Sequence, residues 1–384
     1  MKLNKTIYRI LLILVMGSIT YGVEFDLKSK AAILMDVKTG RVFYEKNIYE
    51  RLPMASISKV MTTLIIMEAI ESGKINLEDE VIASKYAASM GGSQIWLKPK
   101  EKMTVRELLK AVLIVSANDA CVALAEHVSG SEKVFVEKMN NRAESLGMKD
   151  TQFYNTNGLP RANNNYSSVQ DIAIVSRELI NNHPMILEDT SIWTSSLRNG
   201  KSFLRNTNEL VRHNKYVDGL KTGFTSKAGF CITATGKKDG KRFIAVVLNA
   251  PTSDIRFTEI EKLLNYAYSN IKYLEVVKKN KDIGKIKILK GKEKYLSIMT
   301  DSDLTLSITY DEEKDLKVKK IINSKIIAPI KKGQKIGEIT LIKNEEKLGV
   351  VNLIAKEDIR KANLFVIFFR SLKNMIVNIF SSIF

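Results

Sequence analysis

Three short motifs carry residue types that together can catalyse acyl transfer. Ser56 and Lys59 stand three residues apart in Ser-Ile-Ser-Lys, Ser116 and Asn118 flank one alanine, and Lys221 begins Lys-Thr-Gly. A serine hydroxyl is a weak nucleophile at its ordinary pKa and needs a base beside it. Each motif alone arises by chance in a lysine-rich chain, but all three in this order indicate a serine nucleophile with an amine base.

The first motif precedes a run that is apolar at Val60, Leu64, Met67 and Ile70 and predicts a helix over residues 58–72. Residues three apart share a helix face, so the Lys59 amine can lie beside the Ser56 hydroxyl. The amine acts as a base only if its pKa falls, through burial or through a second cation, for which Lys221 is the candidate. The helix N-terminus favours negative charge on Ser56 and supplies N–H groups for an oxyanion hole. The competing interpretation is that Ser56 or Ser58 is an ordinary helix cap.

The other two motifs supply groups that can bind a substrate. Ser116 and Asn118 are expected on one loop, where they relay a proton and hold a substrate amide. Lys221 and Thr222 can bind a carboxylate, and Gly223 permits close approach of the backbone at a strand edge. An extended peptide can add alongside such a strand. Each motif also has an ordinary interpretation, a helix cap for the second and a turn for the third.

The elements that must position these motifs alternate between strand and helix patterns. Residues 31–46 predict a hairpin with its turn at Lys38-Thr39-Gly40. Helical patterns cover residues 58–72, 104–115, 118–129, 131–146, 168–182 and 253–271, and strands are expected at 229–237 and 242–248. Strands at both ends with helices between them indicate an α+β fold whose sheet joins segments distant in sequence.

Three further segments differ in character from this part. After about residue 275, alternating lysine-rich runs with turn glycines predict a small β domain. Residues 1–22 have a basic start and an apolar core, the layout of a secretory signal. Over residues 364–384, polar and apolar side chains separate onto opposite faces of a helix, which favours a helix lying on a membrane surface. A core or partner helix and a membrane-spanning helix are the alternatives.

Composition limits the partners and cofactors. The formal net charge of +18 suggests an anionic environment, but no nucleic-acid-binding motif accompanies the lysines, so nucleic acid is not expected. The two cysteines, Cys121 and Cys231, are too few for a disulfide framework or a structural zinc site. The three histidines lack metal-ligand spacing, and we expect neither a metal nor a cofactor.

With these motifs, the chain resembles the low-molecular-mass penicillin-binding proteins, D-alanyl-D-alanine carboxypeptidases of serine peptidase family S11. Other segments that match the family pattern are Gly91-Gly92-Ser93, Leu97-Lys98-Pro99, Asn118-Asp119-Ala120-Cys121, Tyr166-Ser167-Ser168 with Asp171, and Asp218-Gly219-Leu220. The resemblance implies a β-lactamase/transpeptidase-like catalytic domain over 23–274, with an antiparallel sheet flanked by helices. A small all-β domain over 275–357 and an amphipathic membrane-anchor helix within 358–384 follow it.

The resemblance also implies that Ser56 is the acylated nucleophile, Lys59 its base and Ser116 the proton relay. The implied substrate is a peptidoglycan stem pentapeptide, which loses its terminal D-alanine through an acyl-enzyme that water hydrolyses. β-Lactam antibiotics are implied inhibitors, because they acylate the same serine. The implied location is the periplasm or outer face of the cytoplasmic membrane, with peripheral attachment to the membrane surface through residues 364–384.

The implied substrate-binding residues are Asn118, Lys221, Thr222, Gly223 and Phe224. Lys221 and Thr222 recognise the terminal carboxylate, and the backbone N–H groups of Ser56 and Phe224 form the oxyanion hole. Phe224 departs from members that have a histidine after Lys-Thr-Gly, which leaves a backbone role intact and puts a side-chain contribution to substrate choice in question.

Three alternatives stay open on the sequence. A DD-endopeptidase that cleaves crosslinks would use the same site. A class A β-lactamase shares two motifs, but it has Ser-Asp-Asn where this chain has Ser116-Ala117-Asn118, and its deacylating glutamate has no match outside the predicted helix 168–182. A non-catalytic wall-binding protein would keep the fold, although the intact Ser56, Lys59 and Lys221 argue against it.

Overall fold

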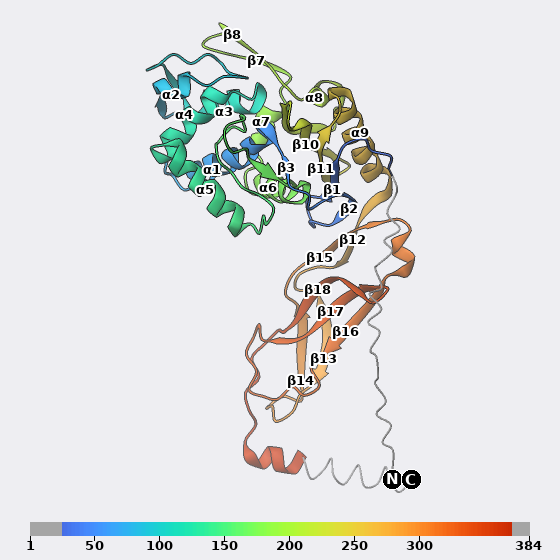
Figure 1. Cartoon of the computed structure of the whole chain (residues 1–384). Helices are drawn as coiled ribbons and strands as arrows, with labels where there is room; N and C mark the ends of the chain where they lie inside the picture. The colour runs from blue at the N-terminus through green and yellow to red at the C-terminus, as the bar shows by residue number, and fades with distance from the viewer. Residues whose placement is uncertain (1–24, 371–384) are drawn as a thin grey trace, which may run out of the picture.

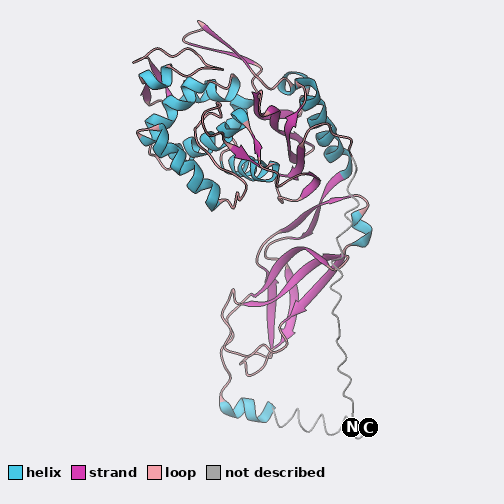
Figure 2. Cartoon of the chain, viewed as in Figure 1, coloured by secondary structure: helices cyan, strands magenta, loops and turns pink. Residues whose placement is uncertain are grey.

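The computed structural model describes residues 25–370 and shows an elongated chain with two folded parts (Figure 1). Helices gather in the larger part, which holds all three motifs, whereas the smaller part is built of strands (Figure 2). The signal predicted in residues 1–22 and residues 371–384 of the predicted anchor helix lie outside the described residues.

A five-stranded antiparallel sheet of order β2-β1-β11-β10-β9 organises the larger part. Its strands are β1 (Ala31–Asp36), β2 (Val42–Lys46), β9 (Val217–Thr225), β10 (Gly229–Lys238) and β11 (Lys241–Ala250). The predicted hairpin reaches the later strands because β1 pairs with β11, with Ala31 opposite Leu248. The expected sheet between distant segments is therefore confirmed, and it leaves β9 at one edge.

The predicted helices are confirmed, with ends within a few residues of those expected. They are α1 (Lys59–Glu71), α3 (Val105–Ile114), α4 (Asn118–Ser129), α5 (Glu132–Ser145), α6 (Val169–Asn182) and α9 (Ser253–Asn270). The shorter helices are η1 (Ala55–Ser58), α2 (Lys85–Ala88), α7 (Ile186–Thr190) and α8 (Leu210–His213). Short strands form two-stranded sheets: β3 (Leu52–Pro53) pairs with β6 (Tyr166–Ser167), β4 (Glu80–Ile82) with β5 (Lys102–Thr104), and β7 (Thr194–Leu197) with β8 (Ser202–Arg205).

Helices cover both faces of the sheet, so β1 is buried along its whole length. Side chains alternate between the two faces of a strand. Ile33 and Met35 accordingly join the core formed with α1 and α3 to α6, whereas Ala32 and Leu34 join the core formed with α9.

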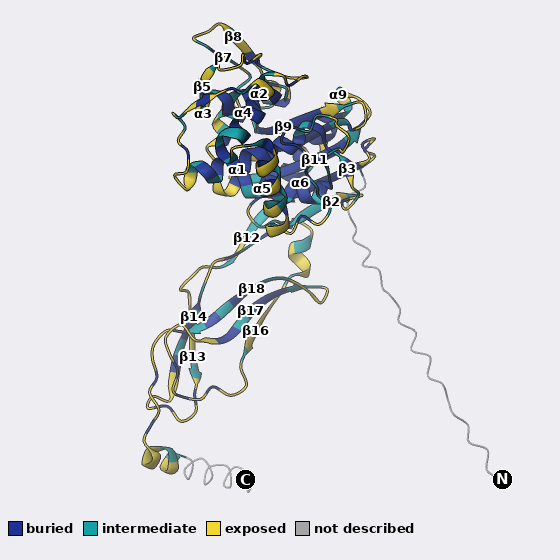
Figure 3. Ribbon diagram, turned by 60° about the vertical axis from the view of Figure 1, so that its left-hand side comes forward, coloured by how far each residue is buried: buried dark blue, intermediate teal, exposed yellow. Residues whose placement is uncertain are grey.

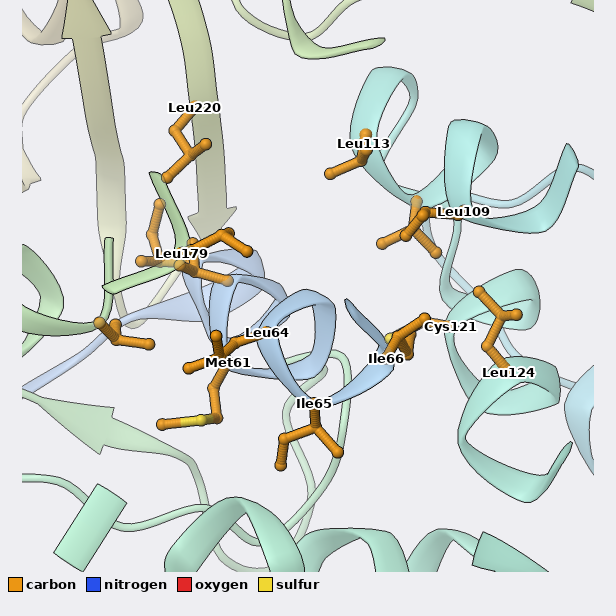
Figure 4. Close-up of a cluster of buried hydrophobic side chains, with 14 of the residues drawn as sticks. Met61, Leu64, Ile65, Ile66, Leu109, Leu113, Cys121, Leu124, Leu179 and Leu220 are labelled. Carbon is orange, nitrogen blue, oxygen red and sulfur yellow. The ribbon is translucent and has the colours of Figure 1, made fainter. Parts of the chain in front are cut away.

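Helix α1 lies at the centre of the larger core. Met61, Leu64, Ile65 and Ile66 point from α1 towards different neighbours (Figure 4). All residues from 59 to 67 are buried, so burial extends well beyond the predicted apolar positions Val60, Leu64 and Met67. The helix packs against α4, α5 and α6 on different sides, which demands apolar residues around its circumference. Its burial fixes the position of the motif at its start.

The smaller part begins at β12 (Ile271–Val277), which follows α9 directly and pairs with β15 (Leu304–Thr309). A second antiparallel sheet has the order β13-β14-β18-β17-β16. Its strands are β13 (Asp282–Lys287), β14 (Tyr295–Thr300), β16 (Lys317–Ile322), β17 (Lys335–Lys343) and β18 (Glu346–Ala355), and a short helical turn, η2 (Glu312–Asp315), precedes β16. These strands enclose a core of their own.

Candidate active site

Ser56 and Lys59 meet at the start of the buried helix. Ser56 lies in η1 and Lys59 is the first residue of α1, and 3.0 Å separates Lys59 Nζ from Ser56 Oγ. The interpretation of either serine as an ordinary cap is wrong, because no side chain caps η1 or α1. Ser58 Oγ instead donates to the Ala55 carbonyl at 2.9 Å. The Ser56 hydroxyl therefore remains available for a hydrogen bond with the Lys59 amine.

Lys59 is fully buried, and two further acceptors hold its amine. Lys59 Nζ lies 2.6 Å from Asn118 Oδ1 and 2.8 Å from the Asn157 carbonyl oxygen. Burial lowers the pKa of Lys59 to about 8, because a charged amine is disfavoured away from water. The neutral amine has two protons for these acceptors and one lone pair for the Ser56 hydroxyl proton. This arrangement is the one that a general base requires.

Lys221 lies buried on β9 and donates to the Thr222 carbonyl at 3.1 Å. Burial, with repulsion from the charges of Lys59 and Arg256, lowers the pKa of Lys221 well below its usual range. The sequence suggested Lys221 as the cation that lowers the pKa of Lys59. In the structure burial has that effect, and the repulsion between the two amines acts on Lys221. A bound carboxylate would favour the charged form of Lys221 again.

Ser116 and Asn118 approach from the turn between α3 and α4, with Asn118 already the first residue of α4. Ser116 is 4% exposed, has a φ of 63°, and its Oγ has no hydrogen-bond partner. Asn118 Nδ2 donates to the Gly91 carbonyl at 2.7 Å, which turns Oδ1 towards Lys59. A strained backbone and an unpaired buried hydroxyl are features of sites that await a ligand.

Asp119 explains why the segment 91–98 accompanies the second motif. This buried carboxylate accepts from the backbone N–H groups of Ile95 and Leu97, the latter at 3.0 Å. The N–H of Asn118 also donates to the Ser93 carbonyl at 2.7 Å. The loop is therefore tied to the start of α4 and holds the acceptor for Asn118 Nδ2.

Strand β9 approaches η1 closely because Gly223 has no side chain. A Cβ at Gly223 would lie 2.9 Å from the Met54 carbonyl oxygen and 3.1 Å from the Ser56 nitrogen. The Thr222 hydroxyl donates to Thr207 Oγ1 at 2.6 Å. The exposed Phe224 ring packs on the Phe230 ring with centroids 4.4 Å apart, so the Phe224 side chain lies against the surface of the sheet.

Sequence reasoning missed the loop that closes the other side of the site. Asn157 supplies the carbonyl for Lys59, and Gly158 follows it with a φ of +80°. A Cβ at Gly158 would lie 1.9 Å from the Ala55 carbonyl oxygen, so only glycine fits there. The Asn-Gly pair in the sequence signals a turn, but nothing local shows that this turn packs against η1.

Glu132, at the start of α5, holds this loop in place. Its Oε1 accepts from Thr156 N at 3.0 Å and from Thr156 Oγ1 at 2.8 Å, while Oε2 accepts from Tyr86 and Arg161. Burial opposes its ionisation, but these hydrogen bonds and the Arg161 charge hold the pKa of Glu132 below its usual value. No sequence pattern indicates this role, because Glu132 also satisfies the pattern of an ordinary helix N-terminus.

The structure thus brings Ser56, Lys59 and Asn118 into direct contact and places the Lys221 charge close enough to repel that of Lys59. Ser116 keeps an unpaired hydroxyl, and Thr222 is bonded to Thr207. Cys121 and Cys231 are buried and unbridged, and within residues 25–370 no cluster of side chains is placed to hold a metal ion. The arrangement can activate a serine for attack on an acyl group.

Comparison with known proteins gives matches along nearly the whole chain. Residues 19–252 match the D-alanyl-D-alanine carboxypeptidase family, and residues 272–361 match the C-terminal domain of penicillin-binding protein 5. The chain is 42% identical over 353 residues to the D-alanyl-D-alanine carboxypeptidase DacF of Bacillus subtilis, covering 91% of this chain and 90% of that protein.

Two solved structures are also similar. Penicillin-binding protein 5 of Haemophilus influenzae superposes with a TM-score of 0.80 at 29% identity, over 88% of this chain and 99% of that one. Penicillin-binding protein D2 of Listeria monocytogenes, in its ampicillin-bound form, has a TM-score of 0.59 at 34% identity, over 64% of this chain and 99% of that one.

Proposed function

Because the chain belongs to the D-alanyl-D-alanine carboxypeptidase family of serine peptidases, we propose that Ser56 is the nucleophile of its reaction. The enzyme is a serine-type DD-carboxypeptidase, which removes the terminal D-alanine from peptidoglycan stem pentapeptides. The observation that carries the assignment is the 3.0 Å contact of Ser56 Oγ with the Lys59 amine, whose pKa burial lowers to about 8.

In the acylation step, Ser56 Oγ attacks the carbonyl carbon of the penultimate D-alanine as its proton passes to Lys59 Nζ. The backbone N–H groups of Ser56 and Phe224 stabilise the oxyanion, a role supported by the close approach of β9 to η1 at Gly223. When the peptide bond breaks, the leaving amine receives a proton through Ser116, whose buried hydroxyl has no other partner. A water molecule then attacks the ester and releases the shortened peptide.

Substrate binding uses the edge of the sheet. Strand β9 is the last strand in the sheet order, so an extended peptide can pair along it. The substrate carboxylate would bind Lys221 and Thr222 and favour the charged form of Lys221. Asn118 would hold the peptide amide by exchanging the contact of its Nδ2 group with the Gly91 carbonyl for one with the substrate.

The same serine is expected to react with β-lactams, because they present a strained acyl group to this nucleophile. The similarity to penicillin-binding proteins, one of them in an ampicillin-bound form, supports this expectation. A DD-endopeptidase acting on crosslinks would use identical chemistry, and only the substrate beyond the scissile bond would differ.

The test is incubation of the protein with a stem pentapeptide and, separately, with a crosslinked dimer, followed by mass analysis. We expect loss of one alanine from the pentapeptide and no cleavage of the dimer. Ser56→Ala should abolish both this loss and labelling by a fluorescent penicillin. Ser72→Ala, just after the other end of α1, is the matched control and should leave both unchanged. Cleavage of the dimer alone would make the protein an endopeptidase, and labelling of Ser56→Ala would contradict the assignment.

We also propose that the catalytic unit spans residues 23–274 and the β-rich unit 275–357, with β12 crossing this border. Secretion through residues 1–22 and peripheral attachment through residues 364–384 complete the proposal. Residues 364–370 are helical and mostly exposed, and within residues 25–370 no helix has the length and hydrophobicity needed to cross a bilayer. Deletion of residues 364–384 should release the protein from membranes at physiological ionic strength, and retention there would refute the anchor.

A further inference from the structure

Three connections leave the β-rich part at one end, and we call them the foot: residues 288–294, 323–334 and 356–363. They join strand ends that the sheet register places together, since Lys287 lies opposite Tyr295 and Ile322 opposite Gly337. The other end of the sheet faces the catalytic part, where Lys343 and Arg41 both bind Glu312. The foot and the helical residues 364–370 therefore lie farthest from the catalytic part (Figures 1 and 3).

The foot is an ordered platform in which its three connections bond to one another. The N–H of Leu289 donates to the Ile326 carbonyl at 2.8 Å, and the N–H of Lys292 donates to the Arg360 carbonyl at 2.8 Å. Buried isoleucines fasten each connection to the core of the sheet, namely Ile288, Ile326, Ile330 and Ile359. The first connection is thus held between the other two.

Apolar side chains project from this platform into solvent. Leu289 is 45% exposed and Ile327 is 46% exposed, and a parallel bridge pairs the two residues. The adjoining helical residues expose Phe365 and Phe368 as well. Arg370 binds this helix to the foot by donating to the carbonyls of Gly291 at 2.7 Å and Lys292 at 3.0 Å. Exposed apolar groups on a rigid surface indicate a contact site.

The side chains around this apolar pair are strongly cationic. The foot holds nine lysine and arginine residues, all exposed, against three acidic ones. The cations are Lys290, Lys292, Lys294, Lys325, Lys331, Lys332, Lys356, Arg360 and Lys361, and the acids are Glu293, Glu357 and Asp358. Exposed apolar groups among lysines match a bilayer surface, whose anionic headgroups overlie hydrocarbon.

We propose that the foot is a second membrane-contact surface, which binds anionic lipid headgroups through its lysines and inserts Leu289 and Ile327 at the interface. This inference rests on the proposed attachment through residues 364–384 and extends it from the tail to the folded β-rich part. A helical tail alone leaves the enzyme free to tilt. Contact through the foot as well would hold the molecule upright, with its long axis pointing away from the bilayer surface. The active site would then lie at the end farthest from the membrane.

The test uses the full-length protein and vesicles of phosphatidylcholine with increasing fractions of phosphatidylglycerol. Reversing three foot charges, Lys290→Glu, Lys292→Glu and Lys361→Glu, should weaken binding to anionic vesicles by about tenfold or more and flatten its dependence on the anionic fraction. Replacing the apolar pair, Leu289→Ser with Ile327→Ser, should weaken binding at every composition.

The matched control reverses three exposed lysines at the opposite end of the β-rich part, Lys279→Glu, Lys314→Glu and Lys317→Glu. This variant has the same net charge and should bind nearly as the wild type. Equal losses in both charge variants would show that only net charge matters, and wild-type binding by the foot variants would also overturn the inference. Unchanged labelling by penicillin and an unchanged Tm establish that each variant is folded.

Two further outcomes separate this inference from its premise. If deletion of residues 364–384 releases the protein while the foot variants bind as the wild type, the anchor stands and the foot proposal fails. If the deleted protein still binds anionic vesicles at physiological ionic strength and the foot variants do not, the tail proposal fails and the foot stands.

If a soluble polyanion binds the foot equally well with or without the apolar pair, the surface serves a wall polymer and the lipid assignment is refuted.

Discussion

The amine of Lys59 lies 3.0 Å from the hydroxyl of Ser56, at the point where η1 leads into α1, whose residues 59 to 67 are all buried. Helical geometry sets this spacing, and burial sets the basicity of the amine. The two residues therefore form one unit, in which the position of the helix in the core controls the chemistry at its end.

Acylation of Ser56 should depend on pH through Lys59. Burial lowers the pKa of Lys59 to about 8, so below that pH most of the enzyme carries a protonated amine that cannot accept the serine proton. The second-order rate of labelling by a fluorescent penicillin should fall about tenfold for each pH unit below this value and level off above it. A flat profile across neutral pH, with the fold intact by circular dichroism, would contradict the assignment of Lys59 as base.

Gly158→Ala should impair the site more than a comparable glycine elsewhere. The new Cβ would meet the Ala55 carbonyl oxygen at 1.9 Å and displace η1, so acylation should fall about 100-fold. Gly147→Ala is the control, because Gly147 has a similar φ of +75° with nothing within 4 Å of its Cβ. Both substitutions cost about 1–2 kcal/mol of backbone strain, so equal losses of labelling would show that strain alone is responsible.

Glu132→Ala should slow acylation although Glu132 does not touch Ser56. Its loss leaves the N–H and hydroxyl of Thr156 without their acceptor, which should cost about 1–3 kcal/mol of stability and loosen the Asn157 carbonyl that holds Lys59. Labelling should fall at least about tenfold if the amine shifts. Glu137→Ala, exposed on the same helix, should change neither quantity. A loss of thermal stability with full labelling would limit Glu132 to a structural role.

The junction between the two parts should depend on Glu312. Arg41 donates to both of its oxygens and Lys343 to one, and although burial opposes ionisation, these bonds lower the pKa of Glu312 to about 2. Because this pKa is depressed, its contribution to stability is present above pH 4.5, the ordinary value, and is lost as pH falls towards 2. Glu312→Gln should broaden the distribution of molecular shapes measured by small-angle scattering at neutral pH.

Two measurements check this prediction about the junction. Glu313→Gln is the control, since Glu313 pairs with Lys272 of β12, which already belongs to the smaller part, and should leave the scattering unchanged. Penicillin labelling should be the same in both variants, because the junction is remote from Ser56. Identical scattering of Glu312→Gln and wild type would show that other contacts, such as Tyr273 with Asp36 at 2.6 Å, hold the parts together.

The order and type of the main elements were predictable from the sequence. Hydrophobic periodicity placed the hairpin of β1 and β2 and the helices α3 to α6 within a few residues, because these patterns depend on near neighbours. The same reasoning also placed α1, although the burial of every residue from 59 to 67 extends well beyond the apolar positions of its pattern. The competing interpretation of Ser58 as a cap does not hold, because its hydroxyl binds the Ala55 carbonyl and Asn165.

The sequence by itself determined which residue types are available for acyl transfer, because the three motifs are local and their order is readable. Only the tertiary structure decided how they act. It placed the Asn157 carbonyl and Asn118 on the Lys59 amine, and it made burial the cause of the lowered pKa of that amine. These contacts join segments up to 98 residues apart, and desolvation depends on everything packed around a group, so no local pattern encodes either.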